Sequence, residues 1–188
     1  GYIFTPKDEK LNIFEKLEAY APKVSRIVKE IEQMKEGIAF IFSRFVDSGI
    51  IPMILALESQ GYSKYNGTKD GYNHLLGVKK NSSKGKYIAI TSYRELSGSE
   101  SNITQYLNVA RKKGNENGEK IKVIIVSGCG SEGLDLKWIR QVHIMEPFFH
   151  FSQIEQAEGR AFRNNSHIEL DPKDRNCTVY YHATKYPD

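Results

Sequence analysis

The sequence predicts an α/β fold in which helices cover both faces of a mainly parallel sheet. Short runs of consecutive apolar residues, such as 38–42 and 123–126, alternate with longer stretches whose apolar residues lie three and four positions apart. An uninterrupted apolar run is typical of a strand buried on both faces, whereas the wider spacing is typical of a helix with one buried face. The alternation of the two patterns favours parallel strands joined by helices.

The first predicted elements are a helical region and a buried strand. Residues 10–34 have helical spacing, and Pro22 divides them into two helices, because proline fits the first turn of a helix and disrupts its interior. Gly37 then precedes a strand at 38–42, and a further helix is predicted over 50–61.

The remaining predicted elements continue this alternation. Strands are predicted at 87–91, 122–126, 141–146 and 177–181, and helices at 102–112 and 152–163. In an open parallel sheet, ligands bind beyond the carboxyl ends of the strands. We therefore expect the functional residues in the loops that follow the strands.

The composition favours a folded, intracellular protein. The hydrophobic fraction is 39%, yet no apolar run approaches the roughly 20 residues that a membrane helix requires, so no membrane partner is expected. Cys129 and Cys177 lack the paired spacing of a zinc site, so we expect no structural metal and no disulfide framework. These features favour a reducing, cytoplasmic environment.

A lysine-rich stretch carries more than the whole net charge of +4. Residues 63–86 contain six lysines, among them Lys79 and Lys80, against one acidic residue. Clustered lysines attract phosphate backbones through the release of counterions, but a solvated surface loop is also often rich in lysine. The sequence leaves both interpretations open at about equal weight.

Residues 127–135 form a glycine-rich stretch directly after the strand at 122–126. Its glycines and serines can bring backbone N–H groups close to an anion, and Asp135 can accept hydrogen bonds from a sugar hydroxyl. The same composition also suits a tight connection between strand and helix without any ligand.

The predicted helix at 152–163 carries Gln156, Arg160 and Arg163 on one face. Two guanidinium groups beside Gly159 can bind a polyphosphate in a bidentate manner, which lysine cannot match. An isolated pair of arginines at this spacing is more typical of ordinary surface salt bridges. The glycine-rich stretch at 127–135 and the arginines at 160 and 163 are more specific together than either is alone.

The order and spacing of these stretches resemble motifs V and VI of superfamily 2 helicases. Gly-Leu-Asp closes the glycine-rich stretch, Gln-x-x-Gly-Arg-x-x-Arg follows one strand later, and residues 38–43 resemble motif IV. The chain thus resembles the C-terminal, second RecA-like domain of these helicases, which implies a RecA-like sheet without its own P-loop. Residues 131–136 and 163–167 are similar to the helicase-like NTPases and early transcription factors of large cytoplasmic DNA viruses. A virion or viral factory is then a possible location.

The resemblance implies that motifs V and VI act in ATP hydrolysis. Arg163, and with it Arg160, would reach the γ-phosphate as arginine fingers and stabilise the charge that develops during phosphoryl transfer. The other residues that the resemblance assigns to the nucleotide are Gln156, Gly133, Asp135 and Gly159.

The resemblance also implies a nucleic-acid contact at the ends of two strands. Ser43 and Arg44 of motif IV, together with Ser127 and Gly128 of motif V, match positions that touch the phosphate backbone. Such contacts hold a strand without reading its sequence. The expected partner is RNA or DNA, with a single strand favoured.

No GxxxxGK[ST] sequence occurs in the chain, so we expect ATP and Mg²⁺ to be bound mainly by an N-terminal RecA-like domain of a longer protein. Residues 1–36 are expected to be a helical lead-in packed on a domain of residues 37–188, with a basic insertion at 63–86. The isolated chain is expected to lack ATPase activity.

Two alternatives to a helicase remain open. One is a binding module for the transcription machinery, and the other is a translocase on duplex DNA without strand separation. Glu132 stands where many helicases have an arginine, and Ala-Phe-Arg ends motif VI where Thr-Gly-Arg is more usual. Both departures leave duplex unwinding open.

Overall fold

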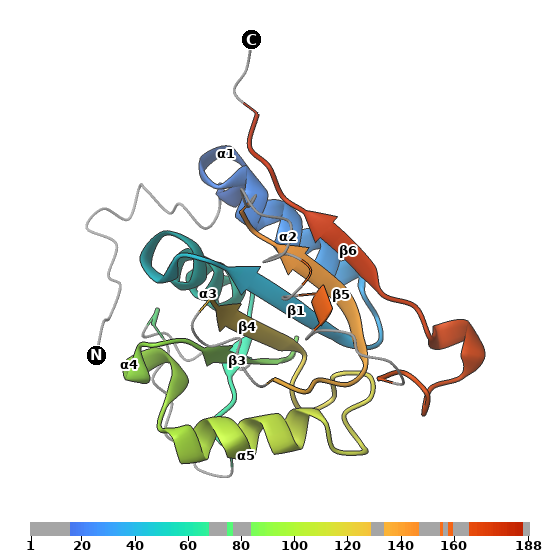
Figure 1. Ribbon diagram of the computed structural model, residues 1–188. Helices are drawn as coiled ribbons and strands as arrows, with labels where there is room; N and C mark the ends of the chain where they lie inside the picture. Colours follow the sequence, from blue (N-terminus) through green and yellow to red (C-terminus); the bar gives the residue numbers. More distant parts are fainter. Residues whose placement is uncertain are drawn as a thin grey trace.

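The computed structural model describes residues 16–67, 75–76, 84–128, 134–146, 155, 158–159 and 166–185. Within them, a 6-stranded parallel sheet has the order β2-β3-β4-β1-β5-β6 (Figure 1). The strands are β1 (Ile38–Ser43), β2 (Ser63–Lys64), β3 (Lys86–Ile90), β4 (Val123–Ser127), β5 (Ile139–Ile144) and β6 (Thr178–Tyr181). The predicted α/β fold with a mainly parallel sheet is confirmed.

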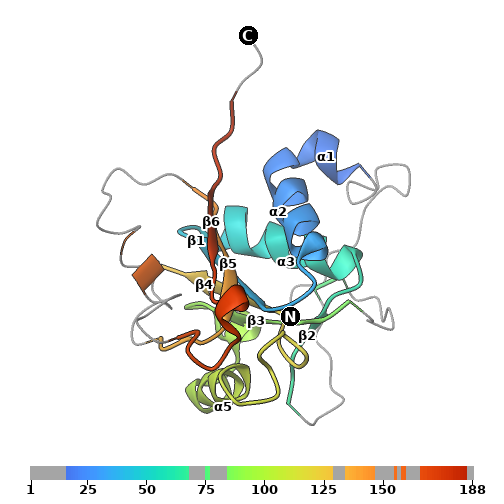
Figure 2. The same cartoon turned by 90° about the vertical axis from the view of Figure 1, so that its right-hand side faces the viewer.

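Helices cover the sheet on both faces. The helices of the described residues are α1 (Leu17–Tyr20), α2 (Pro22–Gln33), η1 (Val46–Ile50), α3 (Ile51–Ser59), α4 (Arg94–Ser97), α5 (Glu100–Ala110) and η3 (Pro172–Asp174). Figures 1 and 2 show α2 and α3 on one side of the sheet and α5 on the other. A separate apolar core lies on each side.

Helix α2 begins where the sequence predicts, at Pro22. Proline occupies the first turn, where its missing N–H leaves no hydrogen bond unmade, and α1 ends two residues earlier at Tyr20. The apolar residues of α2 recur at three- and four-residue spacing and are buried in the core: Val24, Ile27, Val28 and Ile31. The predicted division of this region at Pro22 is confirmed.

The strands alternate between the two cores. In β1, Ile41 lies in the core under α2 and α3, whereas Phe40 and Phe42 lie in the core under α5. In β4, Ile125 and Ile124 divide between the cores in the same way. Because helices cover both faces, every position of these strands is buried, which explains the uninterrupted apolar runs in the sequence.

Several short elements differ from the predicted ones. A π-helical turn, η1, precedes α3, so helical structure begins at Val46 and not at residue 50. Strand β2 pairs with β3 inside the stretch that was predicted to be a loop, and α4 forms just after β3. Strand β5 begins at Ile139, earlier than predicted, because it pairs with β1 from its first residue. Whether such short strands form, and where they begin, depends on pairing with neighbouring strands more than on the local sequence.

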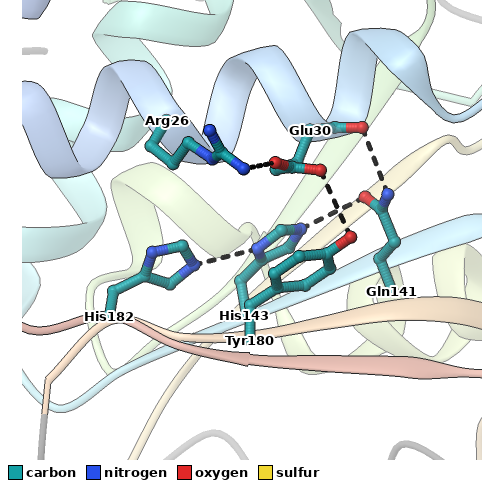
Figure 3. A network of polar contacts seen from close by, with 6 residues as sticks. All are labelled: Arg26, Glu30, Gln141, His143, Tyr180 and His182. Carbon is teal, nitrogen blue, oxygen red and sulfur yellow. Dashed lines mark hydrogen bonds and ion pairs between the residues drawn. The ribbon is translucent and has the colours of Figure 1, made fainter.

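A layer of polar side chains lies between α2 and strands β5 and β6 (Figure 3). His143 of β5 is fully buried, and its Nε2 lies 3.2 Å from Gln141 Oε1. Because the Gln141 amide nitrogen donates to the backbone oxygen of Glu30 at 3.1 Å, the amide oxygen is the acceptor, and His143 Nε2 carries the proton. His143 Nδ1 then accepts a hydrogen bond from His182 Nε2 at 3.1 Å.

Glu30 joins this polar layer to α2. Its carboxylate forms a salt bridge with Arg26, one turn earlier, and accepts a hydrogen bond from the Tyr180 hydroxyl at 3.2 Å. The rings of His143 and Tyr180 stack with centroids 4.8 Å apart. These hydrogen bonds offset the desolvation of polar groups under a helix, so the polar layer fixes α2 on the last two strands.

Burial lowers the pKa of both imidazoles in this layer. The pKa of His143 falls to about 3, mainly because burial disfavours the charged ring and also because of the nearby charge of His182. Burial also lowers the pKa of His182, and the positive charge of Lys23 contributes. In the unfolded chain each ring takes up a proton near pH 6.5, so the folded state binds fewer protons and loses stability as pH falls below that value.

We predict that the free energy of unfolding falls by about 1.4 kcal/mol per pH unit between pH 6 and 5 for each histidine that stays neutral in the folded state. His143→Gln breaks the polar layer, so this variant should be less stable than the wild type at pH 7. It should nevertheless lose less stability on going to pH 5. Urea unfolding across this pH range measures both effects. A variant with the wild-type pH slope would show that His143 does not carry the linkage.

Candidate nucleic-acid and nucleotide interface

The sheet places the ends of three strands side by side. Strand β1 lies between β4 and β5 and runs parallel to both, so their carboxyl ends meet at one edge. Ser43, the last residue of β1, is in register with Ser127, the last residue of β4. Glu146 follows β5, at the point where Met145 N donates to Phe42 O at 2.9 Å. Residues that are distant in the sequence thus become neighbours at this edge.

Glu146 connects the end of β5 to the end of β1. Ser43 Oγ lies 3.0 Å from Glu146 Oε1, and the backbone N–H of Arg44 donates to Glu146 Oε2 at 3.0 Å. Ser43 Oγ also accepts a hydrogen bond from Phe45 N at 3.2 Å. The Ser43 side chain is fully buried, so its hydroxyl is engaged within the protein, whereas Arg44 is exposed.

The glycine of η1 allows this cluster to close. A Cβ atom at Gly49 would lie 2.0 Å from Ser43 Oγ and 3.2 Å from Glu146 Oε1. The first distance is far inside van der Waals contact, so any other residue at position 49 would displace the Ser43 hydroxyl. The turn after β1 therefore depends on close backbone approach at Gly49.

The end of β4 differs from the end of β1. Ser127 is 3% exposed, and within the described part of the chain its hydroxyl has no hydrogen-bond partner. Gly128, the next residue, is exposed, and among the described residues no atom lies within 4 Å of where its Cβ would be. A polar group from a ligand could therefore approach the backbone closely at this point.

A second polar cluster lies at the end of β3, next to β4. Thr91 N donates to Ser97 Oγ at 2.7 Å, and Tyr93 N donates to Thr91 Oγ1 at 3.0 Å. The Tyr93 hydroxyl reaches Asp47 of η1 at 3.5 Å, so the connections after β3 and β1 touch. Hydroxyl or carboxylate groups thus follow four adjacent strands, β3, β4, β1 and β5.

A comparison with known protein families assigns the chain to one of them. Residues 22–165 match the model of the helicase conserved C-terminal domain. The chain belongs to this family. The predicted resemblance to the C-terminal domain of helicases is thereby confirmed, whereas the assignment of individual motifs stays a prediction.

Relatives of this helicase domain include viral and plasmid proteins. A protein of Acanthamoeba polyphaga mimivirus, provisionally named an ATP-dependent RNA helicase, is 31% identical over 187 residues, which are 96% of this chain and 29% of that protein. The termination factor NPH-I homolog of an African swine fever virus isolate is 32% identical over 178 residues, 82% of this chain and 24% of that protein. The chain therefore spans less than a third of the length of either relative.

A solved structure supports the same fold. The C-terminal part of the Fun30 ATPase domain superimposes with a TM-score of 0.54 at 16% identity, covering 85% of this chain and 40% of that one. This likeness concerns the arrangement of the sheet and helices alone. In the described part of the helicase domain, no helix is both long and apolar enough to span a membrane.

The structure describes some of the predicted site residues and not others. Ser43, Arg44, Ser127 and Gly128 lie together at the carboxyl edge of the sheet. Asp135 is exposed between the buried Leu134 and Leu136, and Gly159 is exposed. The predicted residues that lie outside the described part of the chain are Lys79, Lys80, Gly133, Gln156, Arg160 and Arg163.

Sequence reasoning missed Glu146, Gly49 and Thr91. The signal for Glu146 and Thr91 was present, since each ends a predicted strand, which is where functional side chains are expected. No local signal singles out Gly49, because its importance comes from contacts with side chains on two other segments.

His167 anchors the chain after motif VI. Its Nε2 donates to the backbone oxygen of Ile139 at 2.7 Å, so Nδ1 is the acceptor for the Ser166 hydroxyl at 2.9 Å. Ile139 begins β5, so His167 lies at the amino end of that strand, away from the carboxyl edge. These contacts favour a structural role for His167.

We predict different effects on stability from removing the hydroxyls of Ser127 and Ser43, the two serines that are in register at the ends of β4 and β1. Ser127→Ala should leave the free energy of unfolding unchanged or raise it by about 1 kcal/mol, because a buried hydroxyl without a partner is destabilising. Ser43→Ala should lower it by about 1–3 kcal/mol, because Glu146 and the Phe45 N–H lose their partner. Urea unfolding of the two variants measures the difference. Equal losses would show that the Ser127 hydroxyl is also engaged inside the protein.

Proposed function

We propose that the chain is the C-terminal half of an ATP-dependent superfamily 2 helicase or nucleic-acid translocase. In this proposal it holds the nucleic-acid backbone at the carboxyl edge of its sheet and supplies arginines to an ATP site shared with an N-terminal RecA-like domain. The observation that supports the proposal is that Ser43 and Ser127, at the ends of β1 and β4, are in register in a chain of the helicase C-terminal family.

The nucleic-acid contact would use backbone amides and an exposed cation. The exposed Arg44 would pair with a phosphate, and its guanidinium lies 5.8 Å from the centroid of the Phe45 ring, which supports it. Ser127 and Gly128 would offer a hydroxyl and a backbone N–H at the neighbouring strand end. Such groups bind phosphate oxygens without reading bases, as a motor that moves along a strand requires.

The ATP contact would come from motif VI. Arg163 and Arg160 would stabilise the charge that develops on the γ-phosphate, and Gln156, Gly159, Gly133 and Asp135 would complete the nucleotide contact. ATP and Mg²⁺ would be held mainly by the N-terminal domain, so the isolated chain would be inactive. The mimivirus relative, provisionally named an ATP-dependent RNA helicase, supports the use of ATP and of nucleic acid.

A role in transcription is the second candidate. The relative from African swine fever virus is named a termination factor NPH-I homolog, and this chain matches it over 178 residues. A motor of this kind would translocate on nucleic acid beside the transcription machinery, without necessarily separating strands. Strand-displacement and translocation assays on the full-length protein distinguish a motor that unwinds duplexes from one that translocates without separating strands.

We predict that Arg163→Ala in the full-length protein lowers kcat for ATP hydrolysis about a thousandfold in the presence of single-stranded RNA or DNA, because an arginine finger typically accelerates phosphoryl transfer by 10³–10⁵. Arg111→Ala is the matched control, because Arg111 is the C-cap residue directly after α5 and its guanidinium donates hydrogen bonds to Asn108 of that helix. The control should turn over ATP at the wild-type rate. Wild-type turnover in a folded Arg163→Ala variant would rule out the finger.

A further inference from the structure

The carboxylate of Glu146 contacts two consecutive residues at the end of β1. Arg44 N donates to Oε2 at 3.0 Å, and Ser43 Oγ lies 3.0 Å from Oε1 and 2.9 Å from the Phe45 backbone oxygen, so its single proton has two acceptors within reach. The contacts of Glu146 with Ser43 and Arg44 span 103 and 102 residues of sequence. A carboxylate that accepts hydrogen bonds from two donors forms a stronger and more directional link than a neutral amide, because both bonds are charge-assisted.

This link fixes the backbone from which Arg44 extends. The Arg44 N–H donates to Glu146. The residues before and after Arg44 are joined to each other, because Phe45 N donates to Ser43 Oγ at 3.2 Å. The turn after β1 is thus held at three consecutive residues, whereas the Arg44 side chain is exposed above the Phe45 ring. A fixed backbone under an exposed charged side chain reduces the conformational entropy that phosphate binding must overcome.

Gly49 encloses the same cluster from the other side. A methyl group there would come within 2.0 Å of Ser43 Oγ, so the cluster has no room for even one additional carbon atom. The carboxylate of Glu146 and the absence of a side chain at Gly49 therefore both maintain the position of the Ser43 hydroxyl in the turn after β1. The two positions offer independent ways of disturbing it.

We propose that Glu146 is a positioning residue that, together with the buried Ser43, orients Arg44 for contact with the nucleic-acid backbone. This inference rests on the proposed function and extends it, because Glu146 itself does not touch the nucleic acid. The chain continues from Glu146 directly into the segment that carries Gln156, Arg160 and Arg163. Glu146 therefore ties the nucleic-acid contact on β1 to the strand that leads to motif VI.

The test compares Glu146→Gln and Gly49→Ala with the wild type in the full-length protein. ATPase activity is measured against increasing concentrations of a single-stranded oligonucleotide. We expect each variant to raise the half-saturating oligonucleotide concentration about tenfold, because the turn after β1 loses a charge-assisted hydrogen bond or is displaced. The KM for ATP should change by less than about twofold. Because a general loss of folding lowers the maximal rate without changing a half-saturating concentration, the tenfold rise for the oligonucleotide reports on its contact with the protein. Glu169→Gln is the control, because Glu169 is a surface carboxylate paired with Lys137.

The outcomes separate this inference from the proposed function. An unchanged half-saturating concentration in both variants, in a wild type that nucleic acid stimulates, would overturn the positioning role and leave the proposed function intact. Tighter binding by Glu146→Gln would also overturn it, because the carboxylate would then compete with phosphate for Arg44. A wild type that neither binds the oligonucleotide nor responds to it would remove the proposed function, and the inference with it.

Discussion

The parallel pairing of β4, β1 and β5 is the constraint on which the rest of the molecule depends. Adjacent strands lie about 4.8 Å apart, so three parallel strands bring their carboxyl ends within the span of one or two nucleotides. Ser43, Ser127 and Glu146 come together there because β1 pairs in parallel with β4 and with β5, in continuous register from Ala39 to the carboxyl ends of the strands. The two apolar cores hold this pairing rigid, and the short polar segments after the strands inherit its geometry.

The buried polar layer shows how the sheet accommodates polar side chains, Gln141 and His143, on a face that a helix covers. Strand β5 contains Gln141 and His143 on one face, a pattern that would ordinarily indicate exposure to solvent. Both are buried under α2 because Glu30 supplies a backbone acceptor for the Gln141 amide, whose oxygen then accepts from His143. The layer thus attaches α2 to β5 and β6, and its buried histidines lower the stability of the fold in acid.

Much of the architecture could be predicted from local patterns, and the contacts of the site could not. The runs around Ile41 and Ile125 predict buried strands, because a short uninterrupted apolar run bounded by polar residues is typical of a strand covered on both faces. Pro22 likewise marks the start of α2 by its chemistry alone. By contrast, the roles of Glu146 and Gly49 arise from distances to Ser43, across more than one hundred residues in the case of Glu146. Pairing of that range is a property of the assembled sheet, which the local sequence does not encode.

The most direct test concerns the carboxyl edge itself. Binding of a labelled single-stranded oligonucleotide to the full-length protein can be followed by fluorescence anisotropy over a salt series, for the wild type, Arg44→Ala and Lys113→Ala. Lys113 is an exposed cation in the connection that leads from α5 to the amino end of β4, so it serves as a charge-matched control. If Arg44 neutralises a phosphate, its removal lowers the slope of log K against log salt by about one, and removal of Lys113 leaves the slope unchanged. Equal slopes for the wild type and Arg44→Ala would contradict a phosphate contact by Arg44 at the end of β1.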